Sequence, residues 1–200
     1  MSVEIPWSRI ASISAPRPVL FSGNQEGALG GPTLPISRMG DRFAIDVRTT
    51  QLRQDSESRL LIAALTEATT ADARIAIKLP NAPALTGVNA AVVDGANQSG
   101  MQLKLRALSS GASIPRGYFF SVLHGGVHFV YMAAAAVTAG GDGKVTLPIW
   151  PMLRFLTTDG EICALANPMI EGQLVGFDGR GATFTRARTD PMSFSIVERA

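Results

Sequence analysis

The residue types that could catalyse a reaction or bind a metal are few in this 200-residue chain. The two histidines, His124 and His128, stand four residues apart in the segment HGGVH, and the only cysteine is Cys163. Two histidines at that spacing face one metal ion together on a helix, but the intervening Gly125-Gly126 pair predicts a turn. We therefore interpret both histidines as polar hairpin residues and Cys163 as a small buried apolar residue.

Other patterns that carry chemistry are also missing from the sequence. The glycine-rich segment GALGGPT at 27–33 lacks the lysine of a phosphate-binding loop. No G-x-S-x-G nucleophile motif is present. The carboxylates are scattered, and most stand in predicted turns or at a helix start, where local backbone hydrogen bonds explain them. We therefore expect no catalytic, metal-binding or cofactor-binding residues, no cofactor and no enzyme activity.

Composition argues against a nucleic-acid-binding or membrane-spanning protein. The chain is 46% hydrophobic and 17% charged, its formal net charge is +2, and no two Lys or Arg residues are adjacent. A clustered basic face is therefore not expected. The N-terminus lacks an apolar signal segment, and the longest mildly apolar run, at 129–139, is too short to cross a bilayer. With one cysteine, no intramolecular disulfide can form, and we expect a soluble protein made in a reducing compartment.

The elements that would position these residues are mostly strands. Apolar and polar residues alternate over 41–49, which places Phe43, Ile45 and Val47 on one face of a strand. A second alternating segment at 73–80 points Ile75, Ile77 and Leu79 inward in the same way. The Gly125-Gly126 and Asp142-Gly143 pairs predict hairpin turns. Further strand patterns lie at 101–108, 117–124, 127–139 and 145–150, and in short segments after 154.

Only one strong helix is predicted, over residues 55–69. Asp55 can cap its first turn, and an apolar stripe indicates that it lies flat on a sheet. Because strands do not alternate with helices, we expect a mainly β fold: an antiparallel β-sandwich or split barrel with one packed α-helix. The stripe consists of Leu60, Leu61, Ala64, Leu65 and Ala68.

The first 40 residues differ in composition from the rest of the chain. They are rich in Pro, Gly and Ser, and Gly30-Gly31-Pro32 marks a loop. We therefore predict an extended arm or long loop region over residues 1–40. Residues 41–200 are predicted to form a single β-rich domain.

The segment from Val92 to Arg154 carries several motifs that occur in one order in a known family. It resembles the distal tail, or tail-tip adaptor, proteins of long-tailed bacteriophages. The motifs are V-x-G-A-x-Q-x-G-x-x-L at Val93 to Leu103, a G-x-F-F-S-I-like strand at Gly117 to Val122, a bulky tyrosine before small residues at Tyr131 to Ala139, a G-x-G turn at Gly141 to Gly143, and T-L-x-I-x-P-x-L-R at Thr146 to Arg154.

The resemblance implies a structural virion protein with a fold similar to that of the tail tube. Such proteins form a ring, usually a hexamer, that joins the tail tube to the baseplate hub and the host-recognition parts. The implied partners are further copies of the chain, the tail-tube protein, the baseplate hub and the tape-measure protein. The implied location is the tail tip, after synthesis in the bacterial cytoplasm. Neither membrane insertion nor sequence-specific nucleic-acid binding is expected.

Two other functions stay open at this point. One is a small β-barrel hydrolase or ligand-binding protein, for which Cys163 and His128 are the best candidate residues. The other is a tail-tube or tail-completion subunit, which belongs to the same structural class.

Six residues are candidates for contact with neighbouring subunits. The glycine-rich loops in 22–40 and the hairpin around 139–144 lack an apolar face, and we expect both to contact neighbours. Trp150, between two prolines, ends the strand at 145–150; either Trp150 and Leu153 cap the core, or this rim meets a neighbour together with Arg154. The candidate interface residues are Gly27, Leu29, Gly30, Gly31, Trp150 and Arg154.

Overall fold

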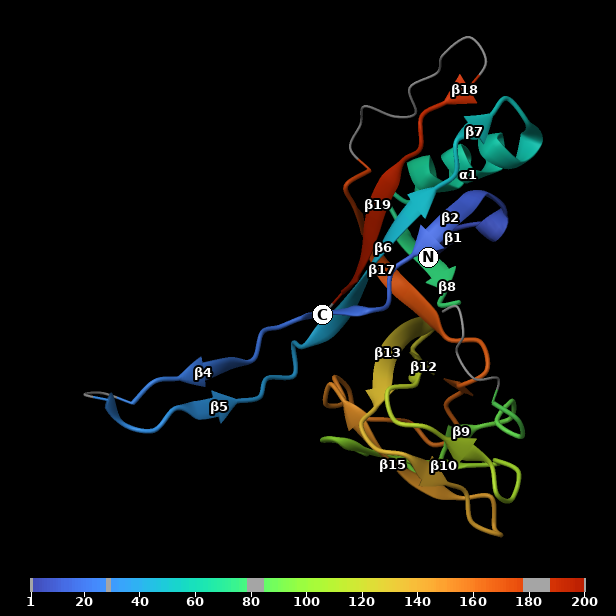
Figure 1. The fold of residues 1–200 in the computed structure, drawn as a ribbon. Coiled ribbons are helices and arrows are strands. Elements are labelled where there is room, and N and C mark those ends of the chain that lie inside the picture. The colour runs from blue at the N-terminus through green and yellow to red at the C-terminus, as the bar shows by residue number, and fades with distance from the viewer. Residues whose placement is uncertain (1, 28–29, 79–84, 178–187, 200) are drawn as a thin grey trace.

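The computed structural model describes residues 2–27, 30–78, 85–177 and 188–199. Its secondary structure is 43% strand and 9% helix, and all strand pairs are antiparallel except β1–β8 among the described residues. The expected mainly β fold with one packed helix is therefore confirmed. Figure 1 shows three parts: a sheet that carries the helix, a second sheet rich in turns, and a hairpin that leaves the body.

The sheet that carries the helix has seven strands, in the order β1-β8-β17-β19-β6-β2, with β3 also paired to β6. A short 3-10 helix, η1 (Trp7–Arg9), leads into β2. The strands are β1 (Ser2–Glu4), β2 (Ile10–Ile13), β3 (Arg17–Val19), β6 (Arg42–Thr49), β8 (Asp72–Ala76), β17 (Met169–Val175) and β19 (Ser193–Glu198).

The apolar face of this sheet follows the alternation seen in the sequence. Phe43, Ile45 and Val47 of β6 are buried, while Asp46 and Arg48 between and beside them are exposed. Ile75 and Ile77 are also buried as predicted, and Leu79 lies outside the described residues. The period of two in the sequence therefore fixes which face of each strand enters the core.

Helix α1 (Ser56–Glu67) covers part of this apolar face. Asp55 caps it by accepting the backbone N–H of Ser58, as the sequence predicts. Leu61 and Leu65 are completely buried, but Leu60 is 65% exposed, so its assignment to the buried stripe is wrong. Neighbouring helix residues point about 100° apart, and a helix packed through Leu61 turns Leu60 toward solvent.

The second sheet has six strands, in the order β16-β12-β13-β15-β10-β9. Its two ends meet, because Val92 of β9 bridges Ile162 and the N–H of Cys163 donates to the carbonyl of Ala91. The sheet therefore closes into a small barrel, and closure removes free strand edges. The strands are β9 (Val92–Val93), β10 (Gln102–Arg106), β12 (Phe119–His124), β13 (Val127–Ala133), β15 (Val145–Trp150) and β16 (Cys163–Ala164).

The hairpin β12–β13 is a wall shared by two hydrophobic cores. Phe120 and Tyr131 point into the barrel, whereas Phe119 and Met132 pack on the core beneath the seven-stranded sheet. The ring of Phe43 meets that of Phe119 edge-on, with 5.4 Å between their centres. The β-rich domain predicted for 41–200 is therefore built around two cores rather than one.

Residues 2–19 depart from the predicted arm. β1 pairs with β8, and β2 and β3 pair with β6, so this segment forms both outer parts of the seven-stranded sheet. Ile5 is 1% exposed and belongs to the core. A segment with few apolar residues can still fold when existing strands supply its hydrogen-bond partners, which local composition does not reveal.

Among the described residues, 20–27 and 30–40 leave the body, and we call them the hairpin arm. The arm contains β4 (Gly23–Gln25) and β5 (Leu34–Ile36), which pair with each other alone. In Figure 1 it extends well beyond the rest of the molecule. Two further short pairs complete the described fold: β11 (Ser113–Ile114) with β14 (Val137–Thr138), and β7 (Leu52–Arg53) with β18 (Arg188–Thr189).

Gly172 in β17 gives a test of the sheet packing. A Cβ atom there would lie 2.1 Å from the carbonyl oxygen of Val197 in β19. Because backbone cannot retreat inside a sheet, we expect Gly172→Ala to destabilise the protein by about 1–3 kcal/mol in urea unfolding. Gly141→Ala is the control, since a Cβ there meets nothing within 4 Å. Equal unfolding midpoints for the two variants would contradict this packing.

Candidate functional site

The candidate nucleophile Cys163 lies inside the barrel. It is free and buried, and burial strongly raises the pKa of its thiol. The thiol therefore stays protonated at neutral pH, whereas nucleophilic catalysis needs the thiolate. The interpretation of Cys163 as a buried apolar residue is confirmed.

The two histidines lie on the β12–β13 hairpin, as the glycine pair predicts. His124 contacts the carboxylate of Glu161 and stacks on the ring of Phe155, with 3.9 Å between the ring centres. The sequence gives no sign of the Glu161 contact, because 37 residues separate the two. The histidine is thus held against the barrel by partners from the loop after β15 and from the segment before β16.

His128 lies beside a serine. Its Nδ1 is 3.2 Å from the hydroxyl of Ser121, and burial lowers the pKa of the histidine. A serine and a histidine in contact are the residue types of a nucleophile and its base. Ser121, however, is fully buried and its hydroxyl oxygen accepts the N–H of Met169. The pair thus joins β12, β13 and β17, and no substrate can reach it in this arrangement.

No group of three or more His, Cys, Asp or Glu side chains in the described part of the chain is arranged to hold a metal ion. No helix among the described residues is long and apolar enough to cross a membrane.

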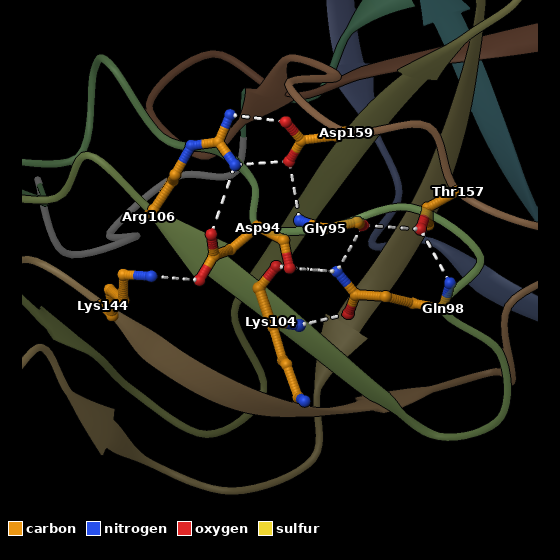
Figure 2. Close-up of polar contacts among 8 residues, drawn as sticks. All are labelled: Asp94, Gly95, Gln98, Lys104, Arg106, Lys144, Thr157 and Asp159. Carbon is orange, nitrogen blue, oxygen red and sulfur yellow. Dashed lines mark hydrogen bonds and ion pairs between the residues drawn. The ribbon is translucent and has the colours of Figure 1, made fainter.

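A cluster of polar contacts connects β10 of the barrel to neighbouring turns (Figure 2). Arg106 of β10 binds Asp159 with both guanidinium nitrogens and also contacts Asp94 at 3.2 Å. Lys144 reaches the other oxygen of Asp94 at 2.9 Å. The hydrogen bonds from Arg106 and from the N–H of Gly95 lower the pKa of Asp159 to about 2. The cluster joins three turns that are distant in sequence.

Gln98 closes the turn beside this cluster. Its amide nitrogen donates to the carbonyls of Asp94 and Gly95, and its amide oxygen accepts the N–H of Lys104 at 2.7 Å. Thr157 adds a hydroxyl that accepts the N–H of Gln98 at 3.0 Å. The hydrogen-bond donors and acceptors of these residues pair with one another. They therefore stabilise the barrel and leave no open ligand position between them.

The predicted interface residues Trp150 and Arg154 contact their own chain. The side chain of Arg154 is 4% exposed and donates to Glu198 at 2.8 Å. Its guanidinium carbon lies 4.9 Å from the centre of the Phe129 ring. Trp150 packs edge-on against Phe43, with 5.1 Å between ring centres. A charge this buried is already paired within its chain, and contact of Arg154 with a neighbour stays a prediction.

The alternative interpretation of this strand end is confirmed. Leu153 is 1% exposed and lies in the barrel core, and Trp150 packs against the core of the seven-stranded sheet. The strand end therefore joins the two cores. The turn around 139–144 also packs on its own chain, since the carbonyl of Gly143 accepts the N–H of Leu108 at 3.1 Å. Contact of this turn with neighbours stays a prediction.

The buried carboxylate of Glu198 is the partner of Arg154. It also accepts the backbone N–H of Phe43 at 2.8 Å and that of Val130 at 2.6 Å. Burial raises the pKa of Glu198, and the Arg154 guanidinium and these two N–H groups oppose that rise. One side chain thus connects β19, β6, β13 and the segment after β15.

The remaining candidate residues lie in the hairpin arm. Gly27, Gly30 and Gly31 belong to the connection between β4 and β5, and Gly30 has a φ of +82°, which suits glycine. Leu29 lies outside the described residues. Sequence reasoning chose the glycines and missed the large apolar side chains around them. Those that are exposed are Leu20 (59%), Phe21 (46%), Leu34 (60%), Ile36 (39%) and Met39 (56%).

These apolar side chains make the hairpin arm the best candidate for a functional surface. No protein-family model matches the chain, and no curated protein is detectably similar to it. Function is therefore inferred from the geometry described above. That geometry shows an internally braced body and an arm whose apolar side chains meet solvent.

The Glu198 pair gives a second test. Glu198→Ala leaves Arg154 buried without its partner, and we expect a loss of about 3–5 kcal/mol in the free energy of unfolding. Glu4→Ala removes the exposed partner of Arg74 and should cost at most about 1 kcal/mol. Urea unfolding monitored by tryptophan fluorescence measures both. Similar losses for the two variants would show that the buried pair does not join the cores.

The pKa of Asp159 gives a third test, through pH. A carboxyl with a folded pKa near 2 and an ordinary value of 3.8 stabilises the fold above about pH 4, and this contribution is lost as pH falls through about 2. Asp159→Asn should therefore lower the melting temperature at pH 7 and have little effect near pH 2. If the difference in melting temperature between Asp159→Asn and the unchanged chain is the same at both pH values, the charge of Asp159 does not stabilise the fold.

Proposed function

We propose that this chain is a structural subunit that assembles with further copies of itself into a ring, as distal tail proteins of long-tailed bacteriophages do. The observation that carries the proposal is the hairpin arm. Five large apolar side chains of the arm are between 39% and 60% exposed, and both of its strands are exposed at every position. An exposed apolar cluster of this kind is typical of a protein interaction site.

The arm needs a partner for physical reasons. An isolated two-stranded hairpin is at best marginally stable in water. Leu34 and Ile36 stand two apart on β5, so they point to the same side of the hairpin. Pro35 lies between them and has no N–H to offer an additional strand. The arm is therefore suited to pack its apolar side against a surface rather than to extend a sheet.

A second copy of the chain is the partner that the proposal favours. An arm that leaves one body and packs on another is a heterologous contact, and repetition of such a contact closes a ring when the rotation permits. The closed barrel has no free edge for pairing, whereas β1 and β2 stand at the outer edges of the seven-stranded sheet. Contact between copies is thereby directed to the sheet side of the molecule and the arm.

The finer part of the proposal rests on the resemblance in residues 92–154. It assigns a ring, expected to be hexameric, that connects the tail tube with the baseplate hub and host-recognition parts at the tail tip of a virion. A tail-tube or tail-completion subunit would use the same kind of ring and is distinguished by the protein that it binds. For the hydrolase alternative, no observation favours Cys163 or His128, since the thiol and the neighbouring serine are buried.

Ring formation is tested by comparing two variants in which exposed apolar side chains are replaced by serine. Leu34→Ser combined with Ile36→Ser removes the apolar side of the arm, while Leu60→Ser changes an equally exposed leucine on α1 (65%). Native mass spectrometry and negative-stain imaging should show rings for the unchanged chain and for Leu60→Ser, and monomers for the arm variant. Circular dichroism should show the same β content in all three.

Two outcomes would contradict the proposal. If the unchanged chain is a monodisperse monomer at micromolar concentration and forms no ring, self-assembly is wrong. If the arm variant forms rings as well as the unchanged chain does, another surface joins the subunits.

A further inference from the structure

The β-ladder is interrupted where the hairpin arm leaves the body. β3 pairs with β6 as far as Val19 and Arg42, and β4 pairs with β5 from Gly23 and Ile36 onward. Three residues separate these two pairs on the first leg of the arm and five on the second. Because the legs cannot stay in register, their backbone N–H groups need other acceptors at this point.

The carboxylate of Asp41 provides those acceptors. Its Oδ1 accepts the N–H of Phe21 at 2.7 Å and that of Ser22 at 2.7 Å, and its Oδ2 accepts the hydroxyl of Ser22 at 2.5 Å. The Ser22 oxygen in turn accepts the N–H of Arg38 at 2.7 Å. The Asp41 carboxylate on the second leg thus accepts hydrogen bonds from two consecutive backbone N–H groups of the first leg. Ser22 on the first leg accepts a hydrogen bond from a backbone N–H group of the second leg.

The surroundings of Asp41 are built to protect these bonds. Asp41 is 6% exposed, although it stands at the base of an exposed arm. The guanidinium of Arg42 lies 4.6 Å from the centre of the Phe21 ring, and a Cβ on Gly40 would stand 3.0 Å from that ring. The ring therefore closes over Gly40, which has to be small. Hydrogen bonds to a carboxylate are strong when water is excluded from them.

The charge on Asp41 is favoured in this setting. Burial raises its pKa, but the hydrogen bonds from Ser22 and Phe21 outweigh burial and hold the pKa below its usual value. The carboxyl group is thus ionised at neutral pH and acts as an acceptor on both oxygens. The charged groups nearest to it in sequence are Arg38 and Arg42, whose positive charge suits an ionised carboxylate.

Beyond this joint, the described residues of the arm strands are exposed on both sides, so the direction of the arm depends on its base. We propose that Asp41 is the positioning residue of the hairpin arm, which clamps the two legs across the gap in the ladder and sets the angle at which the arm meets its partner. The benefit of a fixed arm angle rests on the proposed function: an arm that is already ordered loses less conformational freedom when the subunits assemble. The clamp itself does not depend on assembly.

The test measures the distance between the arm and the body by electron paramagnetic resonance. Spin labels are attached at Asn24→Cys on β4 and at Glu67→Cys at the end of α1; the native Cys163 is buried and should stay unlabelled. The protein is studied as a dilute monomer. We expect one narrow distance distribution with Asp41 in place, and a distribution at least about twofold broader in Asp41→Ala, as a joint that has lost its local stability would give.

Three further variants separate positioning from general damage. Asp41→Asn keeps an oxygen for the backbone N–H groups but cannot accept the Ser22 hydroxyl at its NH₂ group, so its distribution should be intermediate. Ser22→Ala leaves Asp41 in place and should also be intermediate. Asp142→Ala is the matched control, because that carboxylate accepts the N–H of Lys144 in an exposed turn of the barrel, and it should leave the distribution unchanged.

Two outcomes would contradict the proposal that Asp41 clamps the arm. An unchanged distribution in Asp41→Ala would show that the strand register alone directs the arm. A collapse of the thermal unfolding transition in Asp41→Ala, together with an unchanged distribution in Ser22→Ala, would assign Asp41 to the stability of the body. Failure of the ring proposal looks different: the chain would stay monomeric at every concentration while the arm still broadens in Asp41→Ala.

Discussion

The buried carboxylate of Glu198 is the interaction on which the arrangement of the two cores depends. It stands at the end of β19 and accepts hydrogen bonds from Phe43 of β6, Val130 of β13 and Arg154 beyond β15. Without an acceptor at this point, two backbone N–H groups and a guanidinium would be buried without partners, which is far more costly than an ordinary hydrogen bond is favourable. The barrel and the seven-stranded sheet are thus joined by polar bonds as well as by the aromatic contacts of Phe43.

Sequence reasoning found the elements whose patterns are local. The helix from Ser56, the hairpin through Gly125-Gly126 and the buried face of β6 follow from the periods 3.6 and 2, a capping aspartate and a glycine turn. Pairings between distant segments leave no such trace. Nothing around Arg154 indicates that its partner stands 44 residues further along the chain, so the burial of this charge does not follow from local sequence.

The glycines of 27–31 mark the hairpin arm in the sequence, because they belong to a segment without a core of its own. The exposed apolar side chains of the arm, such as Leu34 and Ile36, have an ordinary appearance in the sequence, since exposure is a property of the whole fold. Residues 2–19 had the same composition as the arm and yet complete a sheet, so composition alone could not place the boundary near residue 20.

The hairpin arm combines a hydrogen-bonded base with a glycine-bearing connection between its strands, and both properties would suit the proposed assembly. A base held by Asp41 limits the directions that the arm samples, which reduces the entropy lost when the arm docks. The glycines at the tip, including Gly30 with its positive φ, permit local adjustment to the surface that is met. An arm that was flexible throughout would reach many surfaces and prefer none, whereas one that was rigid throughout would tolerate no mismatch. In the proposed ring, a joint fixed at Asp41 would give the arm the same angle in every copy, which is the condition for a repeated contact to close on itself.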